Sequence, residues 1–285
     1  MPTYLGADGA RLHYDEIGDP GAPTLVVLAG GAARHPEYLG DLAGLGADFR
    51  LVVPHLRGVG RSPRPADKAR GAAWRQADDL ELLRTHLGLE TLALAGHSAG
   101  TRLAVAYAAQ HPQRVARLLL LTPPAQGLTD IPSDAGASAD ERRRTDPDVA
   151  RALDALAAGP DMTSEAAFNA WHLAVAPATY AHWGAAEQAH ARAARFDLAA
   201  ARAYFSVPTP DDVADRLRAL AAPVLVVAGG ADLFTGVAPL RALAEVFPRG
   251  ACSVLEDCGH YPWVEQSAAF RQVVDAFLAD GAPTP

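Results

Sequence analysis

Short apolar runs recur along the chain, and each has the length of a strand buried on both faces of a sheet. Stretches with helical composition or helical spacing of apolar residues lie between them. The runs are 24–28, 51–54, 92–95, 115–121 and 223–228, with further strands expected at 11–17 and 252–255 and helices at 75–87, 103–110, 237–247 and 265–278. This alternation predicts an α/β fold with a doubly wound, mostly parallel sheet.

Residues 125–215 interrupt the alternation. They contain no β-branched apolar run and are rich in alanine, arginine, aspartate and aromatic residues, which favours helices. We therefore expect a helical cap inserted into the α/β core. The predicted organisation is a first part of the core at 1–124, the cap at 125–215 and a second part of the core at 216–285.

One apolar run leads directly into a Gly-x-Ser-x-Gly sequence formed by Gly96, Ser98 and Gly100. An alanine-rich stretch of helical composition follows, so the motif lies at a sharp turn between a strand and a helix. Such a turn brings the two backbones close together and leaves no room for a Cβ atom at the flanking positions. Ser98 is the predicted nucleophile, and the alternative is a glycine-rich turn with an idle serine. We expect His97, at the variable position, to support the turn rather than to act as the base.

A serine hydroxyl needs a base within hydrogen-bond reach, and the base needs an acid that orients it. Asp232 follows the predicted strand 223–228, and His260 follows the strand 252–255. In doubly wound sheets, loops at the carboxyl ends of strands carry such groups. The order Ser98, Asp232, His260 is that of α/β-hydrolases. Asp130 is a rival acid, and Asp257 is expected to be structural.

Acyl transfer also needs hydrogen-bond donors aimed at the oxygen that becomes negatively charged. The backbone N–H of Ala99, directly after the predicted nucleophile, is one candidate donor. The second is expected from the glycine-rich turn after the strand 24–28, where Gly31 is preferred and Ala32 is the alternative.

Composition and charge limit the other functions. With 285 residues, 49% of them hydrophobic, the chain can form one large α/β domain with an insertion. A net charge of −8 and the lack of a basic stripe argue against a nucleic-acid partner. Cys252 and Cys258 form neither a disulfide framework nor a metal-ligand spacing, so neither metal nor cofactor is expected.

The chain is expected to be cytoplasmic and to make no membrane contact. No apolar run approaches the ~18 residues of a membrane-spanning helix, and the N-terminal segment lacks a signal-peptide pattern. A small-molecule substrate is the expected partner. The sequence leaves the oligomeric state open.

Several motifs together resemble the α/β-hydrolase superfamily and, within it, the proline iminopeptidase-like branch. The segment 28–33 stands where that branch has His-Gly-Gly-Pro-Gly, and 56–62 is similar to its Arg-Gly-x-Gly-x-Ser loop. Gly259-His260, followed by Pro262 and Glu265, is similar to its histidine loop. The resemblance covers roughly 5–125 and 215–280 and implies the hydrolase fold with a Ser-His-Asp triad.

Some positions depart from the branch. Ala29 and Ala32 replace the histidine and the proline of the oxyanion loop. Iminopeptidases hold the free amino terminus of the substrate with acidic cap residues. The cap glutamates Glu141, Glu165 and Glu187 stand in no matching context, so this role is not transferred.

The sequence therefore predicts a serine hydrolase that cleaves an ester, a lactone or a small amide. A proline iminopeptidase is the first alternative, and a non-hydrolytic or ligand-binding member of the fold is the second. The expected pocket residues are Ala29, Gly30, His97, Trp171, Tyr180 and Trp183. For the three aromatic residues, helix packing against the core is an equally good explanation.

Overall fold

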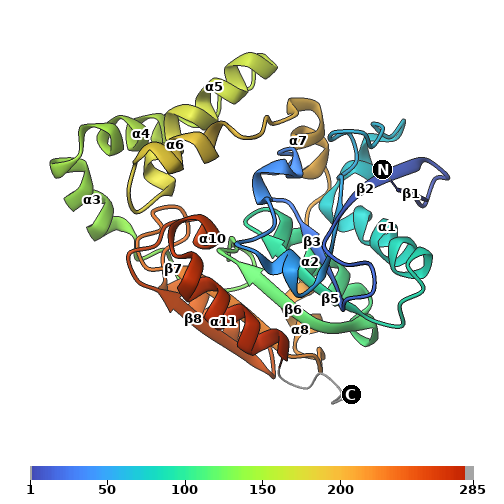
Figure 1. Cartoon of the computed structure of the whole chain (residues 1–285). Helices are drawn as coiled ribbons and strands as arrows, with labels where there is room; N and C mark the ends of the chain where they lie inside the picture. The colour runs from blue at the N-terminus through green and yellow to red at the C-terminus, as the bar shows by residue number, and fades with distance from the viewer. Residues whose placement is uncertain (1, 280–285) are drawn as a thin grey trace.

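The computed structural model describes residues 2–279 and contains an eight-stranded sheet with the order β1-β2-β4-β3-β5-β6-β7-β8 (Figure 1). The pairs β1–β2 and β2–β4 are antiparallel, and the other neighbours are parallel. The strands are β1 (Thr3–Leu5), β2 (Arg11–Ile17), β3 (Thr24–Leu28), β4 (Arg50–Pro54), β5 (Leu92–His97), β6 (Val115–Leu121), β7 (Val224–Gly229) and β8 (Gly250–Leu255). The predicted sheet is confirmed, and the short strand β1 was not predicted.

Both faces of the sheet are buried because apolar residues occupy successive positions along the central strands. Val26, Leu94, Leu118 and Val224 are paired in register across four strands and belong to one core cluster. The residues next to them, such as Val27, belong to a second cluster on the opposite face. A strand that buries both faces has no polar alternation, and this explains the continuous apolar runs in the sequence.

Helices cover the two faces. One cluster includes residues of α1 (Ala73–His86), α2 (Gly100–Gln110), α8 (Val213–Leu217) and α9 (Ala238–Val246), and the other includes residues of α11 (Ser267–Ala279). The helix predicted at 265–278 starts later than expected. A short helix α10 (Pro262–Glu265) precedes it, and α11 begins at Ser267 after the C-cap residue Gln266.

The chain leaves the sheet after β6 and returns to it at β7. Between these strands lie α3 (Gly136–Thr145), α4 (Pro147–Ala158), α5 (Glu165–Val175), α6 (Ala185–Arg192), α7 (Leu198–Tyr204) and α8. In Figure 1, α3 to α6 gather beyond one end of the sheet. Val213 and Leu217 of α8 already pack in the core cluster with α2. The assignment of 125–215 as a cap stays a prediction, and α8 favours a boundary a few residues earlier.

No helix within residues 2–279 is long and apolar enough to cross a membrane.

Candidate active site

Ser98 stands at a strained turn between β5 and α2. Its φ is 49°, in the left-handed region that a non-glycine residue occupies only when the surrounding structure holds it there. A Cβ atom at Gly96 would lie 2.9 Å from Thr101 Cα, and one at Gly100 would lie 2.5 Å from the Leu28 and Ala29 carbonyl oxygens. Both glycines of the motif are therefore required by close backbone contacts.

Asp232 and His260 lie in the loops that follow β7 and β8. The His260 Nδ1 and Asp232 Oδ2 atoms are 2.7 Å apart, and both side chains are buried. Because a carboxylate only accepts hydrogen bonds, Nδ1 carries a proton, and in the neutral form of the ring Nε2 has a free lone pair.

The Asp232 carboxylate is held in its ionised form. Burial opposes ionisation, but the charge of His260 and hydrogen bonds from His260, Thr235 and Phe234 lower the pKa of Asp232 below its ordinary value. The Thr235 hydroxyl donates over 2.6 Å and the Phe234 N–H over 2.9 Å. Asp232 thus accepts from three donors, and its side chain is buried.

Ser98 and His260 line the same cavity, which has a volume of about 900 Å³. Within residues 2–279, no direct hydrogen bond joins the Ser98 hydroxyl to the His260 ring. Such contacts are often open in the free enzyme and tighten when substrate binds. The histidine backbone is firmly held, since the His260 N–H donates to the Thr179 oxygen over 2.7 Å and its carbonyl accepts from Thr122 Oγ1 over 3.0 Å.

Two residues of the cavity wall have backbone N–H groups without a protein acceptor in the described part of the chain. Gly31 and Ala99 both line the cavity, and in the described part of the chain neither N–H has a protein acceptor. The Gly30 N–H, in contrast, is occupied by the Tyr38 hydroxyl at 2.6 Å. Gly31 adopts a φ of 68°, which glycine tolerates without a steric cost. Ala32, the alternative donor, also lines the cavity.

Tyr38 links the glycine-rich turn after β3 to the serine turn, and this role was not predicted. Its hydroxyl lies 2.8 Å from His97 Nδ1, and His97 Nε2 lies 3.0 Å from the His260 carbonyl oxygen. A carbonyl only accepts, so His97 donates from Nε2 and accepts from Tyr38 at Nδ1. Burial, followed by the charge of His260, lowers the pKa of His97 well below its ordinary value, in agreement with a neutral ring.

The predicted pocket residues divide into two groups. His97 and Trp171 line the cavity, whereas Ala29, Gly30, Tyr180 and Trp183 do not. The Ala29 carbonyl and Gly30 are packed into the backbone of the serine turn. The Tyr180 ring is fully buried and stacks on the Tyr261 ring. The Trp183 ring also packs against the Tyr180 ring, so both Tyr180 and Trp183 take part in aromatic packing. These four residues lie outside the wall of this cavity, and their role as pocket residues stays a prediction.

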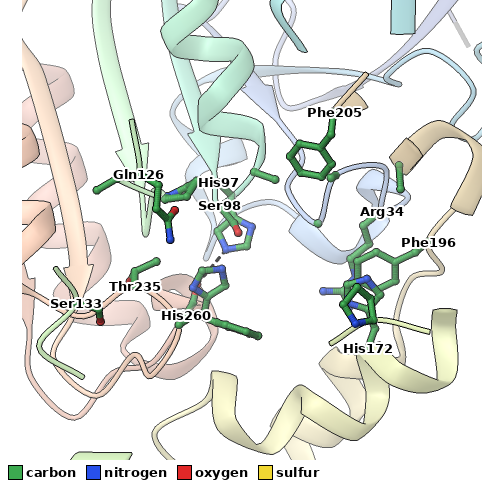
Figure 2. A pocket seen from close by; sticks show the side chains of 18 of the residues that line it. Arg34, His97, Ser98, Gln126, Ser133, His172, Phe196, Phe205, Thr235 and His260 are labelled. Atoms are coloured by element: carbon green, nitrogen blue, oxygen red, sulfur yellow. Dashed lines mark hydrogen bonds between the residues drawn. The ribbon is translucent and has the colours of Figure 1, made fainter. Parts of the chain in front are cut away.

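Three side chains that the sequence analysis missed form one wall of the cavity: Arg34, His172 and Phe196. Figure 2 shows them on one side of Ser98 and His260, while Gln126, Ser133 and Thr235 lie on the other. Arg34 follows the glycine-rich turn closely in sequence, and this proximity was the one available signal. His172 and Phe196 come from the helical segment, where no sequence pattern distinguishes cavity-facing positions.

The two other candidate acids have different surroundings. Asp130 lines the cavity but makes no hydrogen bond to His260. Asp257 has a φ of 50° and its carbonyl accepts from the Gln266 side chain, which agrees with the structural role expected for it. Among the residues that the structure describes, no group of three or more His, Cys, Asp or Glu side chains is arranged to hold a metal ion.

Glu265 supports the histidine loop from behind. Its carboxylate accepts from the N–H groups of Ala181 at 2.6 Å, Gly259 at 3.1 Å and Tyr261 at 3.3 Å. Burial raises the pKa of Glu265 to about 7, although these three hydrogen bonds act in the opposite direction. One carboxylate therefore connects both sides of His260 to the segment before α6.

Comparison with known proteins identifies the family of the chain. A family model described as "alpha/beta hydrolase fold" matches residues 23–266. A 2-hydroxymuconate semialdehyde hydrolase from Pseudomonas putida is 27% identical over 96% of this chain and 92% of its own. A proline iminopeptidase from Xylella fastidiosa is 33% identical, over 40% of this chain and 36% of its own. The crystal structure of an esterase from Rhodococcus sp. ECU1013 covers 99% of both chains at 25% identity, with a TM-score of 0.74.

The matched segment includes Ser98, Asp232 and His260, and it extends from before β3 to the end of α10. Relatives and solved structures with hydrolase and esterase names match nearly the whole chain, while the iminopeptidase match covers less than half of it. The chain belongs to the α/β-hydrolase fold family and is a hydrolase of that superfamily.

Proposed function

We propose that the chain is a serine hydrolase that cleaves an ester, a lactone or a small amide through an acyl-enzyme. The observation that carries the proposal is the buried contact of 2.7 Å between His260 Nδ1 and Asp232 Oδ2, in a cavity that Ser98 shares. A histidine oriented in this way presents its Nε2 lone pair as a base.

In the proposed reaction, Ser98 Oγ forms a bond to the substrate carbonyl carbon while its proton passes to His260 Nε2. The carbonyl oxygen becomes negatively charged and accepts hydrogen bonds from the N–H groups of Gly31 and Ala99. His260 then gives its proton to the leaving alcohol or amine, and the acyl group remains on the serine. Asp232 orients the imidazole and stabilises its charged form throughout.

Water completes the cycle. His260 takes a proton from the water, the resulting hydroxide bonds to the acyl carbon, and the Ser98 oxygen leaves with the proton. The proposed steps use side chains and backbone N–H groups of the protein together with water. Loss of one oxyanion donor in such sites typically lowers kcat by roughly 100- to 1,000-fold.

Iminopeptidase activity has less support. A substrate with a free amino terminus needs a carboxylate near the cleaved bond, and the carboxylate in the described cavity wall is Asp130. The wall near the oxyanion loop carries the Arg34 cation instead, which would repel an ammonium group. Of the cap glutamates, Glu187 accepts a hydrogen bond from the Gly184 N–H at the start of α6.

Turnover of p-nitrophenyl esters, a lactone and proline p-nitroanilide by wild type and Ser98→Ala tests the proposal. We expect ester or lactone turnover by wild type alone, labelling of Ser98 by a fluorophosphonate, and an unchanged Tm in the variant. Proline amide cleaved far faster than the esters would establish the peptidase. Neither turnover nor labelling in the folded protein would favour a non-hydrolytic or ligand-binding member of the fold.

A further inference from the structure

One wall of the cavity contains a buried cation without a carboxylate partner. Arg34 is 2% exposed and lies in the loop after the oxyanion glycine. A Cβ atom at Gly31 would lie 3.0 Å from Arg34 Cβ and 2.4 Å from Phe196 Cε1, so this wall adjoins the Gly31 N–H. The Arg34 side chain therefore starts beside the position where the substrate carbonyl is bound in the proposed function.

Neutral groups surround the guanidinium. It donates to the His190 carbonyl at 2.9 Å, the Ala191 carbonyl at 3.2 Å and the Tyr261 hydroxyl at 3.3 Å. Its carbon lies 4.2 Å from the centre of the Tyr38 ring. Within residues 2–279, no carboxylate lies within 4.0 Å of it. A buried charge without a counter-ion is costly, so this wall has a positive potential that an anion would relieve.

Two nitrogen atoms at this wall have no hydrogen-bond partner. Arg34 Nε and His172 Nε2 are both buried and unpaired. The His172 ring stacks on Phe196, with centroids 3.5 Å apart and planes within 2°, which fixes its orientation. Burial, assisted by the charge of Arg34, lowers the pKa of His172 to about 3, so the ring is neutral at pH 7. Buried polar atoms without partners are rare, and each needs an explanation, such as a catalytic role or a bound water or ion.

The opposite side of the cavity differs in chemistry. Gln126, Ser133 and Thr235 lie there and are uncharged. The carboxylate in the described wall is that of Asp130, which is exposed. Arg202 also lines the cavity, but it is exposed and donates to the Met162 carbonyl at 2.7 Å. Among the described lining residues, Arg34 is thus the buried cation. The side of the cavity that contains Arg34 therefore differs in charge from the opposite side.

We infer that the Arg34–His172 wall binds a carboxylate carried by the substrate, so that the preferred substrate is an anionic ester or lactone. This inference rests on the proposed function and adds the substrate class to it. The half-ester of a dicarboxylic acid is the simplest molecule with both groups. Its carboxylate would pair with the guanidinium while its ester carbonyl lies at Gly31 and Ala99.

The test compares the mono-p-nitrophenyl ester of glutaric acid with its methyl-capped neutral diester. We expect wild type to prefer the anionic ester in kcat/KM. A hydrogen bond to a charged group supports an effect of about 10- to 100-fold. Arg34→Gln should bring the ratio of kcat/KM for the anionic ester to kcat/KM for the neutral ester close to one. Arg202→Gln, which removes a cation from the same cavity, should retain the preference.

A second variant guards against damage to the loop, because Arg34 also connects two cap carbonyls. His172→Phe keeps the stacking on Phe196 and removes the nitrogen, and it should weaken the anionic preference several-fold with an unchanged Tm. Glutarate should inhibit neutral-ester turnover competitively in wild type and more weakly in Arg34→Gln.

The outcomes separate the two proposals. Turnover of the neutral ester without preference for the anionic ester would overturn the carboxylate site and leave the serine mechanism intact. An equal loss of both esters in Arg34→Gln would assign Arg34 to loop structure or to the oxyanion, and would also overturn the site. Failure of both esters together with absent fluorophosphonate labelling would instead overturn the proposed function.

Discussion

The Tyr38 hydroxyl lies 2.8 Å from His97 Nδ1 and 2.6 Å from the Gly30 N–H. One phenol therefore accepts from the glycine-rich turn after β3 and donates to the residue before the predicted nucleophile. Through His97 Nε2 and the His260 carbonyl, 3.0 Å apart, the same chain of contacts reaches the predicted base. Three loops that follow three different strands are thus held at fixed separations by two side chains.

Tyr38→Phe tests this connection. Removal of the hydroxyl leaves the buried Gly30 N–H and His97 Nδ1 unsatisfied, so we expect the free energy of unfolding to fall by about 1–3 kcal/mol. We also expect kcat to fall, because the neighbouring Gly31 N–H loses its fixed position. Chemical denaturation and ester turnover measure the two effects. Tyr14→Phe, which removes a hydroxyl 3.2 Å from His86 Nε2, is the matched control and should leave kcat unchanged.

Asp232→Asn tests the assignment of the acid. The amide cannot stabilise a charged imidazole and favours the wrong tautomer, so we expect kcat to fall on the order of 10⁴-fold. Asp130→Asn provides the control, since Asp130 lines the cavity without a contact to His260. A silent Asp232→Asn together with an inactive Asp130→Asn would transfer the role of the acid to Asp130.

Gly31→Ala tests the oxyanion loop. The added Cβ would lie 2.4 Å from Phe196 Cε1 at a φ of 68°, so the loop must shift and the N–H must move with it. We expect kcat to fall roughly 100-fold or more, as when one oxyanion donor is lost. Gly9→Ala has a similar φ of 76° with nothing within 4 Å of its Cβ. The Gly9→Ala variant therefore tests the effect of backbone strain without a steric clash, and we expect a lower Tm and an unchanged kcat.

The raised pKa of Glu265 predicts how the stability of the protein depends on pH. Its pKa is raised to about 7 in the folded protein against an ordinary value of 4.5, so the folded state binds more protons than the unfolded state between these values. The contribution of Glu265 to stability is therefore largest at low pH and decreases as the pH rises from about 4.5 to about 7. Denaturation of wild type and Glu265→Gln across this range isolates the effect. A wild type that gains stability over the variant with rising pH would mean that the three N–H donors outweigh burial.

Much of the fold could be predicted because local patterns coincide with tertiary structure in the central strands. The continuous apolar run of β3 and the sequence around Ser98 each specify a strand or a turn without distant information. β1 was missed because three residues carry no readable periodicity. The roles of Asp232 and His260 were inferred from their positions after strands and remain predictions until variants are measured.

The cavity wall could not be predicted in the same way. Trp171 and Trp183 are equally aromatic, yet Trp171 lines the cavity and Trp183 packs on Tyr180. Which face of a helix meets the cavity depends on how the helices pack over the sheet, and a hydrophobic pattern does not encode this. Tyr38 was missed for a related reason, since its partners Gly30 and His97 come together only through the parallel pairing of β3 with β5.

The long segment between β6 and β7 also affects when the candidate active site forms during folding. Ser98 belongs to the part of the chain before this segment, whereas Asp232 and His260 belong to the part after it. Pairing strands so far apart in sequence carries a large loop-closure cost and is a slow event in folding. A refolding chain can therefore hold a formed serine turn without a base beside it. Recovery of turnover would report the docking of β7 and β8, and it should lag behind the return of secondary structure.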